Sequence, residues 1–279
     1  MSEISFFVDG EKRDFSVSDS QSFFLGKEEV LSQKVTDIVY DQPWYSEGFT
    51  ESDFLSDDEY ESLIDGLTES VKRILHEETS LNTDGFKLEN YHQYVKNNED
   101  HLKVVSRTRD LFSDDFNFPV LKLLPRLESI LNFKLSDIDP KTNEKMHIIV
   151  RINRPQSNDF NPPHKDAYHG VDIDNYIPLF VNFWIPVCGC SSKSNLPIVP
   201  KSHLLSESKV LRTIGGSEVE GNKYRVCVIK SWDGKNKLIR SKVKYGQVLI
   251  FSSHLIHGLA LNNETDMTRV ALEFRLFKA

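Results

Sequence analysis

The stretch Asn161-Pro162-Pro163-His164-Lys165-Asp166 guides the interpretation of the whole chain. Its two prolines favour an extended backbone. On an extended segment residues i and i+2 point to the same side, so the imidazole of His164 and the carboxylate of Asp166 leave the chain together. These groups are two-thirds of a 2-His-1-carboxylate metal site, the ligand set of non-haem Fe(II) oxygenases. Because such a tripeptide is common by chance, the prediction needs a second histidine farther along the chain.

A candidate for that histidine lies in Ser252-Ser253-His254-Leu255-Ile256-His257-Gly258. His254 and His257 are three residues apart, so on a regular strand they face opposite sides and compete for the metal. His257 is followed by a glycine, then by Asn262 and, twelve residues after the histidine, by Arg269.

This order of residues resembles the last strands of the Fe(II)- and 2-oxoglutarate-dependent dioxygenases, most closely the phytanoyl-CoA dioxygenase-like branch. There the distal histidine is followed by glycine, by asparagine and, about a dozen residues on, by arginine. Other segments are similar to strands, a turn and the first-helix entry of that family, namely Leu55–Glu59, Asn182–Pro186, Val199–His203 and Gly246–Phe251. The resemblance covers roughly residues 145–279 and identifies His257, rather than His254, as the third ligand.

The resemblance implies Fe(II) bound by His164, Asp166 and His257, with 2-oxoglutarate and O2 as co-substrates. A guanidinium can bind a carboxylate through two parallel hydrogen bonds, and Arg269 is expected to hold the distal carboxylate of 2-oxoglutarate in this way. The alternative for Arg269 is a salt bridge with a neighbour such as Glu273. Family members that halogenate have a small residue in place of Asp166, so its presence favours hydroxylation or a related oxidation.

Further residues are expected around the same cavity. Asn153 is a candidate for binding 2-oxoglutarate, and Arg151 for binding an anionic group of the substrate or co-substrate. Asn182 and Trp184 share one face of the middle strand and are expected to line the cavity. Tyr168 is expected to close over the metal. The open alternative is that Arg151 and Asn153 face solvent and that Tyr168 is an ordinary exposed tyrosine of a loop.

The other histidines are expected to lie outside the metal site. His203 is predicted to anchor a loop, and His169 to lie at the surface or behind the ligands. His76, His92 and His101 are predicted to be solvated because they belong to the helical region.

Length, charge and cysteine content narrow the class of protein. The chain has 279 residues, enough for a full hydrophobic core. It has no apolar run of 18 residues or more and no basic, apolar leader, so neither a membrane span nor a secretory signal is predicted. Three cysteines without a zinc-type pair favour a cytoplasmic location, and a net charge of −8 argues against nucleic-acid binding. The predicted partner is a small-molecule substrate, and no protein partner is evident.

The first 144 residues are predicted to be mainly helical. Ser56 with Glu59 three residues later is a capping box, and apolar residues follow at helical spacing from Tyr60 to Leu75. This pattern predicts an amphipathic helix of about five turns. Two more helical stretches are expected over residues 91–112 and 119–133.

From residue 145 onward the hydrophobic period becomes two. Short β-branched or aromatic runs alternate with turn signals, at residues 145–153, 179–187, 224–230, 238–243, 247–251, 256–261 and 269–277. Such a series favours a jelly roll. The expected fold is therefore mainly β with helical decoration (α+β), a cupin-like double-stranded β-helix with N-terminal helices on one face. A single oxygenase domain over residues 1–279 is expected, with the metal site in the jelly-roll core of residues 145–279.

The sequence thus predicts an Fe(II)/2-oxoglutarate-dependent dioxygenase that hydroxylates a small polar metabolite, such as a sugar, an aminocyclitol, an amino acid or another secondary metabolite. Two alternatives from other classes stay open. A jelly roll that only binds a small molecule would usually have lost at least one of the three metal-binding residues or Arg269. A cupin-like metalloenzyme that does not use O2 would not need Arg269, so formation of succinate distinguishes it from an oxygenase.

Overall fold

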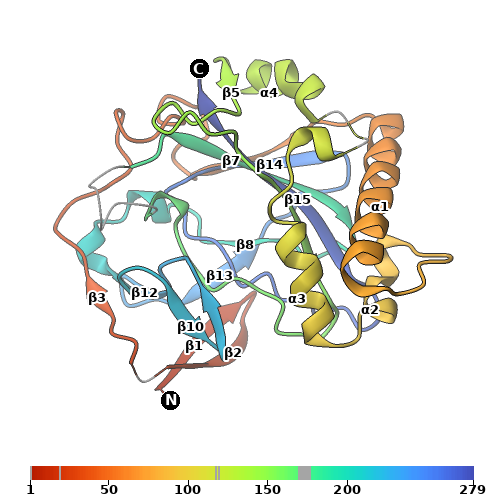
Figure 1. Cartoon of the computed structure of the whole chain (residues 1–279). Coiled ribbons are helices and arrows are strands. Elements are labelled where there is room, and N and C mark those ends of the chain that lie inside the picture. The colour runs from red at the N-terminus through yellow and green to blue at the C-terminus, as the bar shows by residue number, and fades with distance from the viewer. Residues whose placement is uncertain (1, 19, 117, 119, 169–176) are drawn as a thin grey trace.

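The computed structural model describes residues 2–18, 20–116, 118, 120–168 and 177–279. Two six-stranded sheets pack against each other, and a three-stranded sheet lies beside the second of them (Figure 1). Their shared interior contains Trp184 and Phe251 from one sheet and Ile198 from the other. The prediction of a mainly β, jelly-roll fold with helices on one face is confirmed. No helix in the described ranges is long and apolar enough to cross a membrane.

The first sheet, which we call the helix-covered sheet, is antiparallel throughout. Its strands are, in spatial order, β4 (Phe49–Asp53), β14 (Gln247–Ser252), β7 (Phe180–Cys188), β15 (Arg269–Lys278) and β5 (Leu135–Ser136), with β6 (Ile148–Asn153) also paired to β15. Alternate residues of β7 face opposite sides, because Phe183 and Ile185 join the core beneath the helices whereas Trp184 joins the interior core. Both faces of this sheet are therefore buried.

The second sheet, which we call the N-terminal sheet, closes the other side of the interior. It consists, in spatial order, of β11 (Asn222–Tyr224), β10 (Ser217–Val219), β2 (Glu11–Val17), β1 (Ser2–Val8), β13 (Lys237–Arg240) and β8 (Pro197–Ile198). The three-stranded sheet beside it consists of β12 (Ile229–Trp232), β9 (Val210–Arg212) and β3 (Phe24–Leu25).

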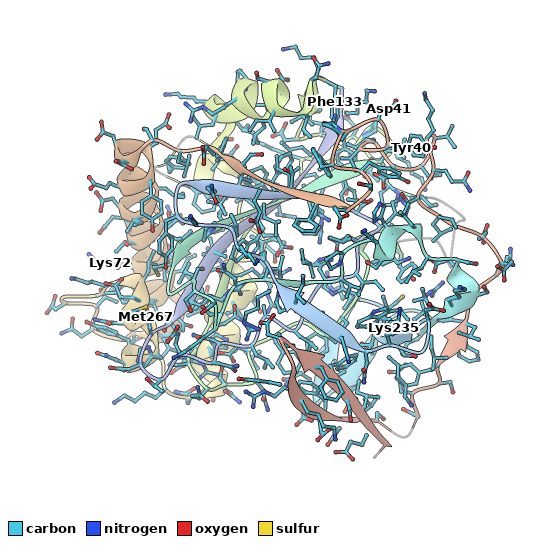
Figure 2. The ribbon with its side chains drawn as sticks, turned by 180° about the vertical axis from the view of Figure 1, so that it is seen from behind. Tyr40, Asp41, Lys72, Phe133, Lys235 and Met267 are labelled. Atoms are coloured by element: carbon cyan, nitrogen blue, oxygen red, sulfur yellow. The ribbon has the colours of Figure 1, made fainter. Side chains whose placement is uncertain are left out.

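The helices cover the outer face of the helix-covered sheet. They are α1 (Asp57–Thr79), α2 (Tyr91–Tyr94), α3 (Asn98–Arg107) and α4 (Leu124–Leu131). The described residues also form the 3-10 turns η1 (Leu88–Asn90), η2 (Ser113–Asp115), η3 (Val120–Leu123), η4 (Asp166–Tyr168), η5 (Ser202–Leu204) and η6 (Glu207–Lys209). The predicted capping box begins α1, since the Ser56 side chain accepts from the Glu59 amide and the Glu59 carboxylate accepts from the Ser56 amide. Lys72 lies on the outer side of this helix (Figure 2).

Several element predictions are corrected by the structure. Residues 2–53 contain strands and no helix among the described residues, so the first 144 residues are not mainly helical. The stretch 91–112 is split into α2 and α3, because Asn97 leaves the helical conformation to cap α3 through its side chain. The stretch 119–133 is a 3-10 turn followed by α4. Strands occupy only the ends of residues 224–230.

The expected strand over residues 256–261 is replaced by a tight loop. Gly258 has a φ of +131° and Leu259 a φ of +51°, neither of which fits a regular strand. A Cβ atom on Gly258 would lie 2.5 Å from the carbonyl oxygen of Pro162. The loop therefore needs glycine both for its backbone conformation and for its close approach to the His164 segment.

The ion pair between Arg126 and Glu59 should contribute to the stability of the fold in a way that depends on pH. The hydrogen bonds from Arg126 (2.8 and 3.1 Å) and from the Ser56 amide lower the pKa of Glu59 from 4.5 to about 2. Because the folded state favours the charged form, this stabilisation is complete above about pH 4.5 and is lost as the pH falls toward 2. Urea unfolding should show Glu59→Gln to be less stable than wild type at pH 7, by a margin that shrinks at pH 3.5. Glu61→Gln, an exposed change on the same helix, should show no such margin.

Because the backbone approaches Gly258 so closely, we expect a single methyl group added there to destabilise the fold strongly. Gly258→Ala should lower the free energy of unfolding by about 1–3 kcal/mol more than Gly215→Ala, because a forced contact is added to the backbone strain. Gly215 is a matched control, since its φ is +72° and no atom lies within 4 Å of an added Cβ. Equal losses of stability in the two variants, measured by urea unfolding, would contradict this explanation.

Candidate metal and co-substrate site

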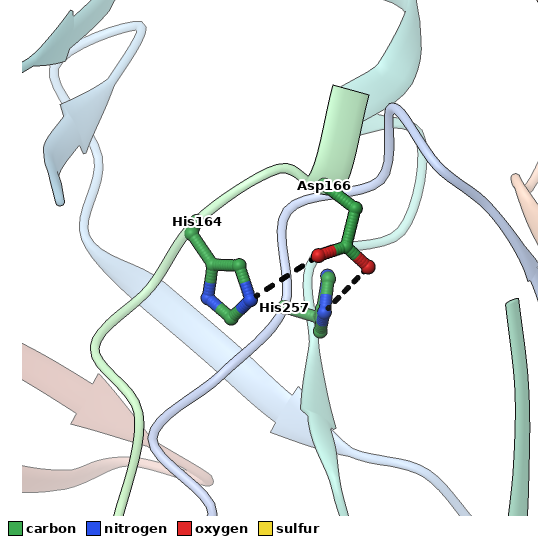
Figure 3. A group of neighbouring side chains, drawn as sticks. All are labelled: His164, Asp166 and His257. Atoms are coloured by element: carbon green, nitrogen blue, oxygen red, sulfur yellow. Dashed lines mark ion pairs between the residues drawn. The ribbon is translucent and has the colours of Figure 1, made fainter. Parts of the chain in front are cut away.

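His164, Asp166 and His257 come together although the histidines are 93 positions apart in the chain. The backbone amides and carbonyls of His164 and His257 exchange two hydrogen bonds of 2.9 and 3.1 Å. This isolated antiparallel bridge places the two imidazoles with ring centroids 4.3 Å apart. Asp166 opens the 3-10 turn η4, and one ligand atom from each of the three residues lies within 4.8 Å of the others (Figure 3).

Both histidines present Nε2 to the carboxylate. Nδ1 of His164 lies 2.7 Å from the carbonyl oxygen of Pro162, and Nδ1 of His257 lies 3.0 Å from that of Leu255. A carbonyl can only accept, so Nδ1 carries a proton, and in the neutral form of each ring Nε2 has the lone pair. The Nε2 atoms lie 3.7 and 3.6 Å from the carboxylate oxygens of Asp166. Burial and the nearby His257 lower the pKa of His164 to about 4, so this imidazole is neutral at pH 7.

Asp166 is ionised and has one unused oxygen. Burial alone would raise its pKa, but Arg275, His257 and His164 lower it below the ordinary value. Arg275 donates to Oδ1 at 2.8 Å, whereas Oδ2 is buried and accepts no hydrogen bond from the described residues. A buried, unpartnered carboxylate oxygen facing two imidazole lone pairs fits a divalent cation such as Fe(II).

Arg269 provides a buried cation in the same cavity as the two histidines. This cavity has a volume of about 570 Å³. The guanidinium is 1% exposed and lies over the ring of Trp184, with its carbon 5.1 Å from the ring centre. Nη1 donates to the side chain of Asn153, while Nε and Nη2 have no partner among the described residues. Burial lowers the pKa of Arg269 to about 10, so it stays charged at pH 7.

The alternative in which Arg269 pairs with Glu273 does not hold. Glu273 accepts two hydrogen bonds from Arg151, of 2.9 and 3.0 Å. Burial would raise the pKa of Glu273, but the charge and hydrogen bonds of Arg151 lower it well below the ordinary range. Arg151 lines the cavity as expected, but its guanidinium is already engaged by this carboxylate. The Nε and Nη2 groups of Arg269 therefore have no hydrogen-bond partner among the described residues.

Asn153 supports Arg269 from the opposite strand. The two residues are direct partners in the antiparallel register of β6 and β15. The backbone carbonyl of Asn153 accepts from the Asn262 side chain at 3.0 Å, and Asn262 also donates to the carbonyl of Met267 at 2.7 Å. Asn262 therefore fixes the turn that leads from His257 to Arg269.

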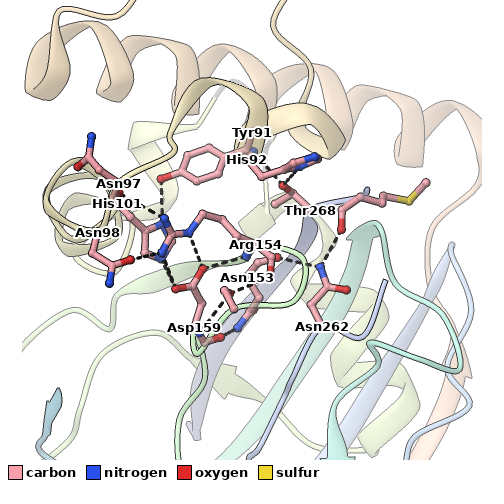
Figure 4. A network of polar contacts seen from close by, with 12 residues as sticks. Tyr91, His92, Asn97, Asn98, His101, Asn153, Arg154, Asp159, Asn262 and Thr268 are labelled. Atoms are coloured by element: carbon pink, nitrogen blue, oxygen red, sulfur yellow. Dashed lines mark hydrogen bonds and ion pairs between the residues drawn. The ribbon is translucent and has the colours of Figure 1, made fainter. Parts of the chain in front are cut away.

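A polar network ties α2 and α3 to the end of β6 (Figure 4). Arg154 donates to Asp159 at 2.8 and 3.0 Å, and the Nε2 atom of His101 lies 3.3 Å from the same carboxylate. The hydroxyl of Tyr91 lies 3.1 Å from the other ring nitrogen of His101. The prediction that His92 and His101 are solvated is wrong, because His101 is buried and His92 contacts Thr268 and Asp266. His76 is exposed as predicted.

The remaining predicted residues have structural contacts. Asn182 accepts from Arg275 at 3.3 Å, and Trp184 stacks on Arg269. The hydroxyl of Tyr168 donates to Glu207 at 2.7 Å, so it is already engaged rather than free to close over a metal.

The histidines that are not in the triad have separate places. His254 lies 2.9 Å from the carbonyl oxygen of Thr36, and His203 lies 2.6 Å from that of Tyr45. Neither belongs to the cluster of metal-binding groups. His169 lies outside the described residues.

Sequence reasoning missed two contacts behind the ligands. Arg275 binds Asp166, a contact for which the sequence had marked no role. Lys165, between the two ligands of the motif, forms a fully buried ion pair of 2.7 Å with Glu207. No motif indicates this pairing, because the two residues are 42 positions apart.

The chain was compared with protein families, curated proteins and solved structures. A family model described as Phytanoyl-CoA dioxygenase (PhyH) matches residues 52–271. No curated protein matches the chain. Among solved structures the chain is similar to EvdMO1, with 17% identity and a TM-score of 0.49 over 85% of this chain and 48% of that one. The chain thus spans about half the length of EvdMO1.

Two further solved structures show similarity of the same order. One is the epimerase SnoN in complex with Fe3+, alpha ketoglutarate and nogalamycin RO, at 14% identity and a TM-score of 0.42 over 85% of this chain and 81% of that one. The other is EctD from S. alaskensis with 2-oxoglutarate and 5-hydroxyectoine, at 11% identity and a TM-score of 0.46 over 95% of this chain and 86% of that one. Identities this low say nothing about the substrate or reaction of the present chain.

The family match runs from β4 into β15 and includes all three residues of the triad as well as Arg269. The triad fits Fe(II), and the buried arginine in its cavity fits 2-oxoglutarate. The chain therefore belongs to the phytanoyl-CoA dioxygenase family and is an enzyme of the Fe(II)- and 2-oxoglutarate-dependent oxygenase superfamily.

Proposed function

We propose that the chain hydroxylates a small metabolite at the expense of 2-oxoglutarate and O2. The observation that supports this proposal is a single cavity that contains two imidazoles and a buried arginine with unused N–H groups. The imidazoles suit Fe(II), and the arginine suits a carboxylate. A jelly roll that only binds a ligand would not need both.

The side chains of the triad would hold Fe(II) on one side. His164 and His257 contribute Nε2, and Asp166 contributes Oδ2, since its other oxygen is held by Arg275. Such a facial arrangement leaves the remaining positions open to the co-substrates. When bound, Fe(II) and 2-oxoglutarate supply an oxidation in which decarboxylation to succinate and CO2 is coupled to attack on a C–H bond.

Arg269 would orient 2-oxoglutarate through its distal carboxylate. Its guanidinium plane is fixed by Trp184 on one face and by Asn153 at Nη1, so little side-chain entropy is lost on binding. The next inward-facing residue of β15 is the small Ala271, which is followed by Glu273 bound to Arg151. Neither residue competes for Arg269.

Asp166 supports hydroxylation rather than halogenation. Its carboxylate occupies the position at which halogenating relatives carry a small residue. Arg275 and the adjacent buried pair of Lys165 with Glu207 hold the Asp166 segment in place. The substrate is proposed to be a small polar metabolite.

Anaerobic titration with Fe(II) and 2-oxoglutarate tests this proposal. The wild type should develop the weak visible charge-transfer band of the metal-bound 2-oxo acid, and His164→Ala or His257→Ala should abolish it. Arg269→Ala should need about 10- to 100-fold more 2-oxoglutarate, because hydrogen bonds to a charged group are lost. His76→Ala and Arg107→Ala are matched controls, since both residues are exposed and lie outside the cavity.

The results of this titration distinguish an oxygenase from the alternative classes of protein. A band that depends on both histidines and on Arg269, followed by formation of succinate under O2, supports an oxygenase. Folded wild-type protein that binds the metal without a band, or without any dependence on Arg269, would contradict the proposal. Circular dichroism of each variant shows whether a lost band reflects a lost fold.

A further inference from the structure

We propose that the substrate of this enzyme is a small organic anion and that Arg109 binds its charged group. This inference rests on the function proposed above and names the substrate class for the same cavity. The sequence had suggested Arg151 for an anionic group, but the ion pair of Arg151 with Glu273 leaves that role to another cation.

Arg109 is held on the wall of the cavity by its backbone neighbours. It follows α3, and the segment 108–111 runs beside β6. The carbonyl of Thr108 accepts from the Val150 amide at 2.8 Å, and that of Leu111 accepts from the Ile148 amide at 2.7 Å. Arg109 is exposed and belongs to a segment that these two hydrogen bonds hold next to the strand that carries Arg151. It lines the same cavity as His164, His257 and Arg269.

The carboxylates of this cavity form no hydrogen bond with Arg109. The acidic residues that line it are Asp159 and Glu273. Asp159 is bound by Arg154, and Glu273 by Arg151. Arg109 makes no hydrogen bond or ion pair with the described residues, and Lys223 adds a second positive charge to the wall.

Binding of 2-oxoglutarate would not engage the guanidinium of Arg109. In the proposed function Arg269 would hold the distal carboxylate of 2-oxoglutarate, and the other end of the molecule would lie beside His164, Asp166 and His257. Glu273 and Asp110 attract Arg109 from a distance, but no carboxylate of the described residues is hydrogen-bonded to it until an anion enters. A planar guanidinium open to the cavity is suited to a carboxylate or a phosphate, each of which can accept two parallel hydrogen bonds.

The rest of the wall favours an anion with an apolar body. Leu102, Val105, Phe160 and Ala260 line the cavity beside the polar groups. Leu102 is 54% exposed, although it lies next to the buried face of α3. An apolar part of a ligand would cover this side chain and gain the corresponding burial energy.

Paired probes can test the inference on the protein loaded with Fe(II) and saturating 2-oxoglutarate under anaerobic conditions. The probes are phenylacetate, phenyl phosphate and the neutral phenylacetamide, and binding is followed by the shift of the visible band and of Tm. At least one anion should bind about tenfold more tightly than the amide, and the preferred anion distinguishes a carboxylate from a phosphate site. Arg109→Gln should lower the affinity for that anion at least about tenfold, and Arg109→Lys should lower it less. Neither change should alter the concentration of 2-oxoglutarate that the visible band requires. Arg107→Gln, a nearby arginine that pairs with Glu77 and Glu78, should change neither.

Three results would overturn the inference: equal binding of amide and anions, no binding of any anion, or unchanged anion binding in Arg109→Gln. A visible band that forms normally in such a case leaves the proposed oxygenase function intact. Absence of the band in folded wild-type protein would instead refute the proposed function, and the substrate class with it.

Discussion

The site depends on the two backbone hydrogen bonds that His164 and His257 exchange. These bonds join the segment that follows β6 to the segment that follows β14, so a connection between distant parts of the chain fixes the spacing of two imidazoles. They require the chains to approach so closely that no side chain fits at Gly258. The carbonyls of Pro162 and Leu255 then orient the rings, so the backbone determines both the position and the tautomer of the ligands.

Charge pairing on the inner face of the helix-covered sheet assigns a different role to each arginine. Arg275 neutralises Asp166, and Arg151 neutralises Glu273, so both cations stabilise buried carboxylates. Arg269 and Arg109 have no such partner among the described residues. The buried cation of Arg269 is costly to maintain without a counter-ion, and that cost would be offset when an anionic ligand binds.

The N-terminal part of the chain completes the barrel rather than only covering it. β1 and β2 provide the centre of the N-terminal sheet, and β4 pairs with β14 next to the middle strand. The helices bury the outer face of the other sheet. Through Tyr91, His101 and Arg154 they also hold the loop that leads to the metal ligands. Strands, helices and site are thus coupled by contacts that join distant parts of the sequence.

The sequence by itself determined the family, the jelly-roll class, the start of α1 and the ligand candidates, because these depend on local patterns: a period of two, a capping box and fixed spacings. It could not determine which carboxylate each arginine binds, because partners such as Arg151 and Glu273 are 122 positions apart. Only the tertiary structure showed that Arg151 and Tyr168 are engaged, that His101 is buried, and that residues 256–261 form a loop. These outcomes depend on long-range packing and charge pairing, which outweigh local propensity.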